Sequence, residues 1–399
     1  MNQGFNTERL WLQRRRLLFM AAAAAAGATD GAVAGTKPTN LRSGLSFPRD
    51  FGAHQQTRLE WWYLSGLLFD GSAPNDAQSQ PRYGFQLTFF RVRGPAAADH
   101  PSAFAARQLM MAHAVLSDIG AATLSHDQRI ARQFPGLAQA SEQDCDVQMG
   151  AWFLRRKDNT QGKDGPSSHY AAAMQGRAHG RFDLAIQLRA PQPILLQSEA
   201  GFSRKGPGAE QFSHYYSQVQ LQGEARLAMQ GRPSDLRALA WLDHEWSDQL
   251  LGAADARSAD KGVGWDWMGI NLHDGSALTL FRLRRADGST LWGGGSYRPA
   301  GAGNLGEVQN FAPEQISMQA LKTWRSPASQ AQYPVAWRLQ TPVAVFTLHA
   351  LIEAQEIDAR ASTGMRYWEG PAELRDTAGR RLGLGYLEMT GYAGAVTLA

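Results

Sequence analysis

The chain has 399 residues, a formal net charge of +4, 43% hydrophobic residues and 19% charged residues. This composition is typical of a chain with a normal buried core, and it excludes a disordered polyelectrolyte or a strongly basic nucleic-acid binder. A single cysteine, Cys145, excludes an internal disulfide and any cysteine-based zinc or iron–sulfur cluster. At about 150 residues per domain, the length indicates two domains.

The first 34 residues have the pattern of an export signal. Arg14, Arg15 and Arg16 precede an apolar run over residues 17–26, and the small residues 32–34 close the segment. The apolar run is shorter than the about 20 residues that span a bilayer, so the pattern predicts a cleaved signal peptide and not an anchor. Paired arginines followed by large apolar residues fit the twin-arginine type. We therefore expect residues 1–34 to be a twin-arginine signal peptide and the mature protein to be periplasmic.

The remaining chain is expected to be mainly β-structure. In residues 83–91 large apolar side chains alternate with Gln86 and Thr88, and this period of two indicates a strand. Residues 59–69 are aromatic on both faces and contain Gly66, which favours a curved strand in a barrel wall. Similar runs cover residues 110–118, 182–188, 215–221, 236–242, 265–272, 277–284, 345–352 and 384–390.

Turns and helices complete the prediction of an all-β protein. Asp-Gly pairs at 70–71, 274–275 and 287–288 favour hairpin turns between the strands. Short helices are expected at most over residues 102–109 and 313–321. Many short antiparallel strands with few helices indicate a barrel or a sandwich.

A domain boundary is expected near residue 249. Residues 249–262 are polar and alanine-rich, and they separate two blocks that are dense in aromatic residues. Residues 61–66 (WWYLSG) in the first block resemble residues 265–269 (WDWMG) in the second, and each precedes a strand that ends in Phe-Arg. We therefore expect an N-terminal domain over 35–248 and a similar C-terminal domain over 249–399.

Residues 241–247 (WLDHEWS) form the densest group of functional side chains. In a strand Asp243 and Glu245 point to one face and His244 points to the other. Histidine exchanges protons near neutral pH, and nearby carboxylates can orient it, so all three are candidate acid–base residues. Trp241 and Trp246 would supply flat apolar walls for a ligand. The alternative is a hydrogen-bonded corner between two barrels.

Two further blocks are candidates for the same site. In residues 264–271, Trp265 and Trp267 share one strand face and are candidate ligand contacts, whereas Asp266 faces the other way. A buried carboxylate needs a partner, so Asp266 is expected to pair with His244 or with a neighbouring backbone N–H. The other candidate ligand contacts are Trp61, Trp62, Gln86, His113 and Tyr215.

Gln86, Thr88 and His113 would form a polar row. Inside an aromatic barrel this row would line a cavity. The alternative is that His113 is a core histidine with satisfied hydrogen bonds.

Other classes of site lack support in the sequence. There is no Gly-x-Ser-x-Gly, no phosphate-binding loop, and no second histidine at the zinc-protease spacing after His244. Asp243, His244, Asp266 and His273 could in principle bind a metal, but no spacing demands one. We therefore expect no metal and no cofactor.

The chain resembles the AttH family, which is related to the carotenoid 1,2-hydratases (hydroxyneurosporene synthases). The passages that carry the resemblance are residues 59–63 (LEWWY), 84–91 (GFQLTFFR), 112–114 (AHA), 215–217 (YYS), 241–246 (WLDHEW), 264–267 (GWDW), 333–337 (YPVAW), 367–370 (YWEG) and 385–392 (GYLEMTGY). The resemblance implies two lipocalin-like β-barrels in tandem and a secreted hydrolase.

The hydratase relatives imply a specific chemistry. They add water to an isolated C=C bond of an isoprenoid, and His244 and Trp246 match the His-x-Trp motif implicated in that reaction. These relatives also use an acid on the strand after the Trp-x-Trp segment. Residues 277–284 contain no acid, so Asp266 or Glu245 would have to replace it.

The resemblance therefore leaves two functions open. One is an exported AttH-like hydratase or hydrolase that acts on a large apolar, isoprenoid or lipid-like ligand by acid–base chemistry in an aromatic cavity. The alternative is a non-catalytic periplasmic carrier of a lipophilic ligand that works with an ABC exporter, because family members occur beside exporter components. Neither function involves nucleic acid or a transmembrane segment in the mature chain.

Overall fold

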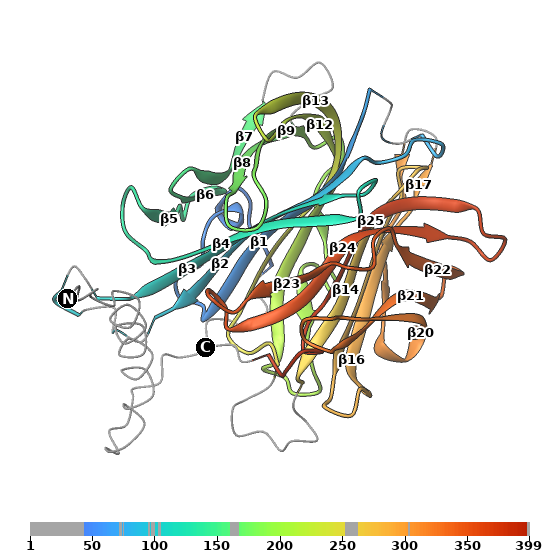
Figure 1. The fold of residues 1–399 in the computed structure, drawn as a ribbon. Helices are drawn as coiled ribbons and strands as arrows, with labels where there is room; N and C mark the ends of the chain where they lie inside the picture. Colours follow the sequence, from blue (N-terminus) through green and yellow to red (C-terminus); the bar gives the residue numbers. More distant parts are fainter. Residues whose placement is uncertain are drawn as a thin grey trace, which may run out of the picture. The chain divides into compact units, whose positions relative to one another are not determined.

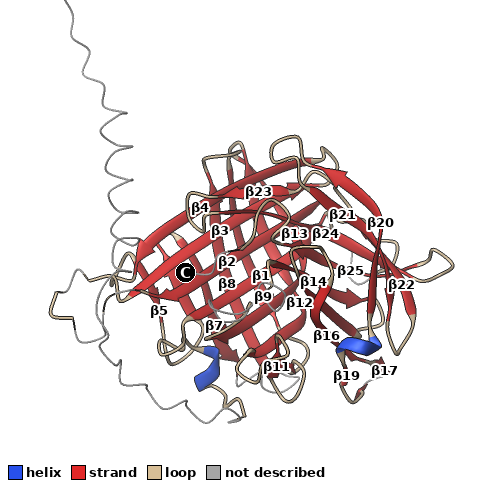
Figure 2. Cartoon of the chain, turned by 90° about the horizontal axis from the view of Figure 1, so that it is seen from below, coloured by secondary structure: helices blue, strands red, loops and turns tan. Residues whose placement is uncertain are grey.

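The computed structural model describes residues 44–396, apart from gaps at 72–73, 75, 95, 97–99, 103–104, 160–166, 252–261 and 302–303. The predicted signal peptide lies outside the described residues. Strands dominate the described elements, as the period-two patterns predicted (Figures 1 and 2). In the described part of the chain, no helix has the length and hydrophobicity needed to cross a membrane.

The first sheet follows the order β4-β3-β2-β1-β13-β12-β9-β8-β7-β6-β5, and β10 and β11 pair with β12. An isolated bridge between His126 of β4 and His179, which follows β8, brings the sheet back on itself as a nearly closed barrel. Its strands are β1 (Leu59–Phe69), β2 (Tyr83–Arg93), β3 (Gln108–Asp118), β4 (Thr123–Arg132), β5 (Ala138–Ala140), β6 (Asp146–Met149), β7 (Trp152–Asn159), β8 (Ser167–Gly176), β9 (Phe182–Arg189), β10 (Leu195–Leu196), β11 (Phe202–Arg204), β12 (Phe212–Met229) and β13 (Arg232–Ser247).

The second sheet follows the order β19-β16-β15-β14-β25-β24-β22-β21-β20, and β23 pairs with β24. Its strands are β14 (Gly264–Leu272), β15 (Ala277–Arg284), β16 (Thr290–Arg298), β19 (Gln309–Phe311), β20 (Ser317–Arg325), β21 (Gln332–Gln340), β22 (Val345–Ala350), β23 (Glu356–Ala359), β24 (Met365–Arg375) and β25 (Arg381–Met389). A small separate ladder joins β17 (Ala300–Gly301) to β18 (Asn304–Leu305).

Strand β1 is buried on both faces, as its aromatic pattern predicted. Trp62 and Leu64 enter the core of the first sheet. Tyr63 packs with residues of the second sheet, among them Trp267 and Tyr386. Residues 44–94 and 106–399 accordingly form one compact unit that contains both sheets.

Two glycines lie in the predicted hairpin turns, and a third allows close packing of aromatic rings. Gly275 and Gly288 have positive φ angles of 91° and 83°, which the predicted Asp-Gly hairpin turns require. A Cβ atom on Gly269 would lie 2.6 Å from the Trp267 ring and 3.0 Å from the Trp241 ring. The glycine therefore allows two indoles from different sheets to pack over the backbone of β14.

The helices expected over residues 102–109 and 313–321 are wrong. Strand β3 already begins at Gln108, and in the later segment one 3₁₀ turn, η3 (Pro313–Gln315), precedes β20. Pairing of β20 with β21 overrides the local helical preference of residues 317–321. The other described 3₁₀ turn is η1 (Arg49–Phe51).

The expected domain boundary falls between the two sheets. Strand β13 ends at Ser247 and β14 begins at Gly264. The division into 35–248 and 249–399 stays a prediction.

Candidate functional site

Strand β13 divides the residues 241–247 between two environments, as the alternation predicted. Trp246 belongs to the core of the first sheet, and His244 stacks there on Trp62 with ring centroids 4.7 Å apart. Trp241 belongs to the apolar cluster that joins the first sheet to the second. Asp243 and Glu245 share the face of Trp241, and Asp243 contacts the Trp241 indole.

Asp243 is held by three side chains. Its Oδ1 accepts hydrogen bonds from the Trp241 indole at 2.7 Å and from Ser217, and its Oδ2 accepts one from the Tyr215 hydroxyl at 2.9 Å. Tyr215 in turn accepts a hydrogen bond from the Trp267 indole at 3.0 Å. Burial raises the pKa of Asp243 to about 7, although these hydrogen bonds oppose the shift. The chain from Trp267 to Asp243 therefore connects the two sheets.

Glu245 forms a buried ion pair. Its carboxylate lies 2.8 Å from the Lys205 ammonium and accepts a hydrogen bond from Ser213. The same ammonium lies 4.9 Å from the Tyr215 ring centroid and 4.2 Å from that of Phe281. Lys205 therefore neutralises the charge of Glu245 while its ammonium lies against two aromatic rings.

Two glutamates of the second sheet complete the region between the sheets. Glu369 of β24 and Glu388 of β25 are directly opposite each other in an antiparallel ladder, and Trp267 of β14 is opposite Glu388 on its other side. Burial raises the pKa of Glu388 to about 7, and the charges of Asp243 and Glu245 add to the rise. Burial and the charge of Glu388 raise the pKa of Glu369 well above its usual range. This pair can therefore hold protons at neutral pH.

Several polar atoms near this carboxyl pair are buried and form at most weak hydrogen bonds among the described residues, as between Tyr63 and Glu369. They are the Tyr63 and Tyr386 hydroxyls, Ser65 Oγ and Glu369 Oε1. Buried polar atoms in proteins are almost always satisfied by protein, water or ligand. Trp61, Trp265 and Glu388 are only partly buried, which gives the region an accessible side.

Asp266 does not join this region or His244. Its carboxylate pairs with Arg282 at 2.7 Å and Arg284 at 3.1 Å, and it accepts a hydrogen bond from the Tyr392 hydroxyl at 2.9 Å. The predicted pairing of Asp266 with His244 is therefore wrong. The physical reason is that Asp266 shares the strand face of Met268, which lies in the core of the second sheet.

The polar row of Gln86, Thr88 and His113 does not lie inside the first barrel. His113 contacts the Tyr367 hydroxyl at 2.8 Å and Ser362 Oγ at 2.9 Å, both in the C-terminal half. Gln86 donates a hydrogen bond to Thr88 at 2.5 Å. Burial lowers the pKa of His113 to about 3, so this histidine is a neutral hydrogen-bonding residue between the halves.

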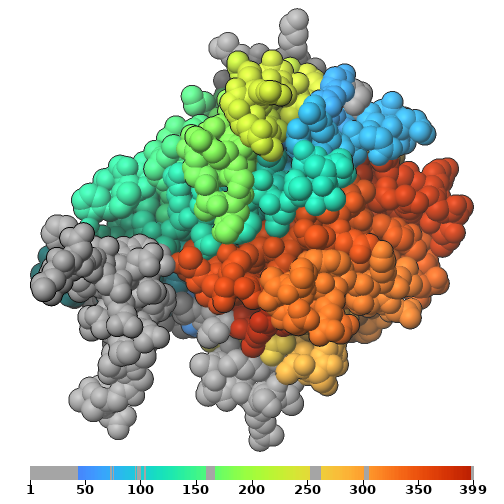
Figure 3. Space-filling view, in the orientation of Figure 1, coloured from blue at the N-terminus to red at the C-terminus, as the bar shows by residue number. Residues whose placement is uncertain are grey.

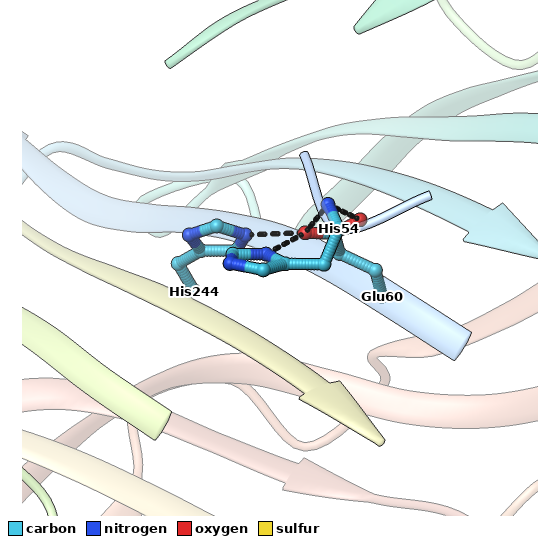
Figure 4. Close-up of side chains that lie close together, drawn as sticks. All are labelled: His54, Glu60 and His244. Carbon is cyan, nitrogen blue, oxygen red and sulfur yellow. Dashed lines mark hydrogen bonds and ion pairs between the residues drawn. The ribbon is translucent and has the colours of Figure 1, made fainter. Parts of the chain in front are cut away.

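His244 lies in a different group inside the first barrel, with His54 and Glu60 (Figure 4). His244 Nε2 lies 2.9 Å from Glu60 Oε1, and its Nδ1 lies 3.2 Å from the Tyr216 hydroxyl. Glu60 also accepts hydrogen bonds from Arg91 Nε at 2.7 Å and His54 Nδ1 at 2.8 Å. Burial alone would raise the pKa of Glu60, but these hydrogen bonds and charges lower it well below its usual range.

The pKa values of the two histidines of this group shift in opposite directions. Burial alone would lower the pKa of His54, but hydrogen bonds to Asp50 and Glu60 raise it. Burial lowers the pKa of His244, which is therefore mainly neutral at pH 7. The ring of Trp246 stacks on His54 at a centroid distance of 3.7 Å and on His214 at 5.4 Å. Trp246 therefore covers the histidine group from within the barrel.

Sequence reasoning missed four of these residues as functional candidates: His54, Glu60, Glu369 and Glu388. Glu60 and Glu388 lie within strand patterns that are otherwise aromatic or aliphatic, and a carboxylate in such a strand requires a specific partner. That signal was available in the sequence. His54 lies in a loop before β1 and gave no signal.

Two antiparallel sheets that meet across a shared aromatic and acidic face define a protein with lipocalin-like β-barrels in tandem. The family model described as AttH-like matches residues 38–392, and the chain belongs to this family.

Two solved structures are similar to this chain. A crystal structure assigned as AttH from Nitrosomonas europaea is 39% identical, with a TM-score of 0.74, and the match covers 88% of this chain and 98% of that chain. Kievitone hydratase from Nectria haematococca is 14% identical with a TM-score of 0.58, covering 90% of this chain and 95% of that chain, and shares the fold. No curated protein matches the chain.

Proposed function

We propose that this protein adds water to, or removes it from, an apolar substrate that binds between the two sheets. The observation that carries the proposal is the opposed pair Glu369–Glu388, which lies beside indole rings and whose raised pKa values favour a protonated carboxyl near neutral pH. A protonated carboxyl can donate a proton to an alkene, and indole faces stabilise the resulting cation. The shared fold with kievitone hydratase, whose name states a water-adding activity, supports this class of reaction.

The proposed reaction balances without a cofactor. Glu388 gives its proton to one alkene carbon, and the other carbon becomes a cation beside Trp265 and Trp267. Water attacks this cation, and the proton that water loses returns to the Glu388 carboxylate. The acid is regenerated, and a tertiary alcohol is the product. The reverse sequence removes water.

Binding of an apolar ligand tests the part of the proposal that a hydratase and a carrier share. Trp61 and Trp265 pack together with Leu59 and Leu250 and are partly buried. We expect a polyene or isoprenoid alcohol probe to quench tryptophan fluorescence, and Trp265→Ala to weaken its binding about tenfold by removing stacking area.

Trp324→Ala, a change in the second sheet away from the acidic face, is the matched control and should leave binding unchanged. Mass spectrometry of molecules that co-purify with the protein would identify the natural ligand class. Absence of any probe binding would contradict both functions.

A carrier without catalysis is the second candidate. The observation that favours it is that three predicted catalytic acids are already bound: Asp243 by hydrogen bonds, and Glu245 and Asp266 by cationic side chains. Such a carrier would exchange a lipophilic ligand with an ABC exporter in the periplasm.

Either function is proposed to act in the periplasm after twin-arginine export. Replacing Arg14 and Arg15 together by lysine should leave uncleaved precursor in the cytoplasm, because the pathway requires the arginine pair. Fractionation and the mass of the periplasmic chain measure this, and a mature N-terminus near Gly35 is expected. Normal export of the double variant would contradict the twin-arginine route.

A further inference from the structure

We propose that the first barrel binds a divalent transition-metal ion between His54, Glu60 and His244. His54 Nδ1 lies 2.8 Å and His244 Nε2 lies 2.9 Å from the same oxygen, Glu60 Oε1. All three donor atoms lie within 4.8 Å of one another, and Figure 4 shows both imidazoles directed at this carboxylate. These donors now lie at hydrogen-bonding separations, and a tetrahedral ion about 2.0–2.2 Å from each would require them to move apart to about 3.3–3.6 Å.

The surroundings of the three donors are those of a metal site. The second nitrogen of His54 lies 3.1 Å from Asp50 Oδ1, and the second nitrogen of His244 lies 3.2 Å from the Tyr216 hydroxyl. Metal-binding histidines are typically oriented in this way by a partner on the other ring nitrogen. These contacts leave His54 Nδ1 and His244 Nε2 able to act as ligands once their protons leave.

The charges of the group also suit a cation. With both imidazoles neutral, as metal binding requires, Asp50 and Glu60 supply two carboxylates against one guanidinium, that of Arg91. Arg91 Nε bonds to Glu60 Oε2, which is the oxygen that the imidazoles do not share. Its positive charge therefore lies on the far side of the carboxylate.

The donor set and its accessibility indicate the kind of ion. Two imidazoles and one carboxylate suit zinc, iron, cobalt or nickel and do not suit magnesium or calcium. The His54 side chain is 13% exposed, whereas those of Glu60 and His244 are fully buried, so an ion would enter past His54.

The sequence predicted no metal, and the proposed site differs from that prediction. Glu60 and His244 are 184 positions apart, and no short spacing connects them. An ion here would tie the loop before β1 to β1 and β13. Its binding would replace two N–H···O hydrogen bonds by metal–ligand bonds.

Equilibrium dialysis of the chelator-treated full mature chain with Zn²⁺ tests the site. We expect one Zn²⁺ per chain and no comparable binding of Mg²⁺. His54→Gln and His244→Gln should each weaken Zn²⁺ binding by about a hundredfold or more, and Asp50→Asn by about ten- to a hundredfold. His214→Gln is the matched control, because His214 also stacks on Trp246 but does not contact Glu60, and its affinity should equal that of the unmodified chain.

Anomalous diffraction at the zinc edge gives an independent readout. A peak between His54, Glu60 and His244 supports the site, whereas a peak elsewhere overturns it. Lack of Zn²⁺ binding by the unmodified chain, or unchanged binding by His54→Gln, also overturns it. If His244→Gln does not fold, the partly exposed Asp50 and His54 variants and the diffraction peak still decide. None of these readouts depends on hydratase activity.

Discussion

Replacing Glu388 by glutamine should lower the rate of water addition by about 10²–10⁴-fold, while binding of a polyene probe stays within about tenfold. Glutamine keeps the size of the side chain and can still form hydrogen bonds, but its amide cannot transfer a proton as a carboxylic acid does. The measurement is turnover of an isoprenoid alkene by mass spectrometry, beside fluorescence titration with the same probe. If the protein is a hydratase, Glu388→Gln must lose turnover and keep probe binding. A carrier has no turnover to lose.

The pH dependence of the unmodified enzyme should agree with this result. The pKa of Glu388 is raised to about 7, so the protonated fraction falls as pH rises through 7, and the rate should fall with it. Glu224→Gln is the control, because Glu224 lies on the surface in an ion pair with Arg237. If Glu388→Gln retains the full rate, Glu388 is not the proton donor.

Arg91→Met should lower the free energy of unfolding by about 3–5 kcal/mol. The Arg91 and Glu60 side chains are fully buried, 2.7 Å apart, and Arg91 also donates to Gln108, to the His54 carbonyl and to Thr57. Removing the guanidinium leaves a buried carboxylate with fewer donors, and this is costly in a medium of low dielectric constant. Urea unfolding followed by tryptophan fluorescence measures the change.

Arg82→Met is the matched control for this change. Arg82 pairs with Asp70 at 3.0 Å, but both side chains are about half exposed, so the loss should be at most about 1 kcal/mol. Equal losses for the two variants would mean that the buried pair contributes no more than a surface pair.

The strand pattern was predictable because alternation along a strand directly reflects two environments. The sequence predicted that Asp243 and Glu245 lie on one face and His244 on the other, and the contacts of β13 confirm it. The same alternation placed Gln86 and Thr88 together. Alternation could not show which face of β2 points into the barrel, so the prediction that this polar row lines a cavity inside the barrel is wrong.

The partners across the sheets could not be predicted. Alternation gives the face of a residue but not the strand that will lie opposite. Asp266 was expected to pair with His244 or with a neighbouring backbone N–H, yet the ladder between β14 and β15 sets Arg282 opposite Asp266. The His54–Glu60 contact likewise depends on a loop conformation that no periodicity describes.

The burial of β1 on both faces makes the two halves of the molecule energetically inseparable. Trp62 stabilises one core and its neighbour Tyr63 stabilises the other, so loss of either core exposes apolar surface of the same strand. The halves should consequently melt in a single cooperative transition, and a fragment that ends at residue 248 would expose the Trp241 and Tyr63 face and aggregate. Two barrels in tandem should in this way fold and unfold as one unit.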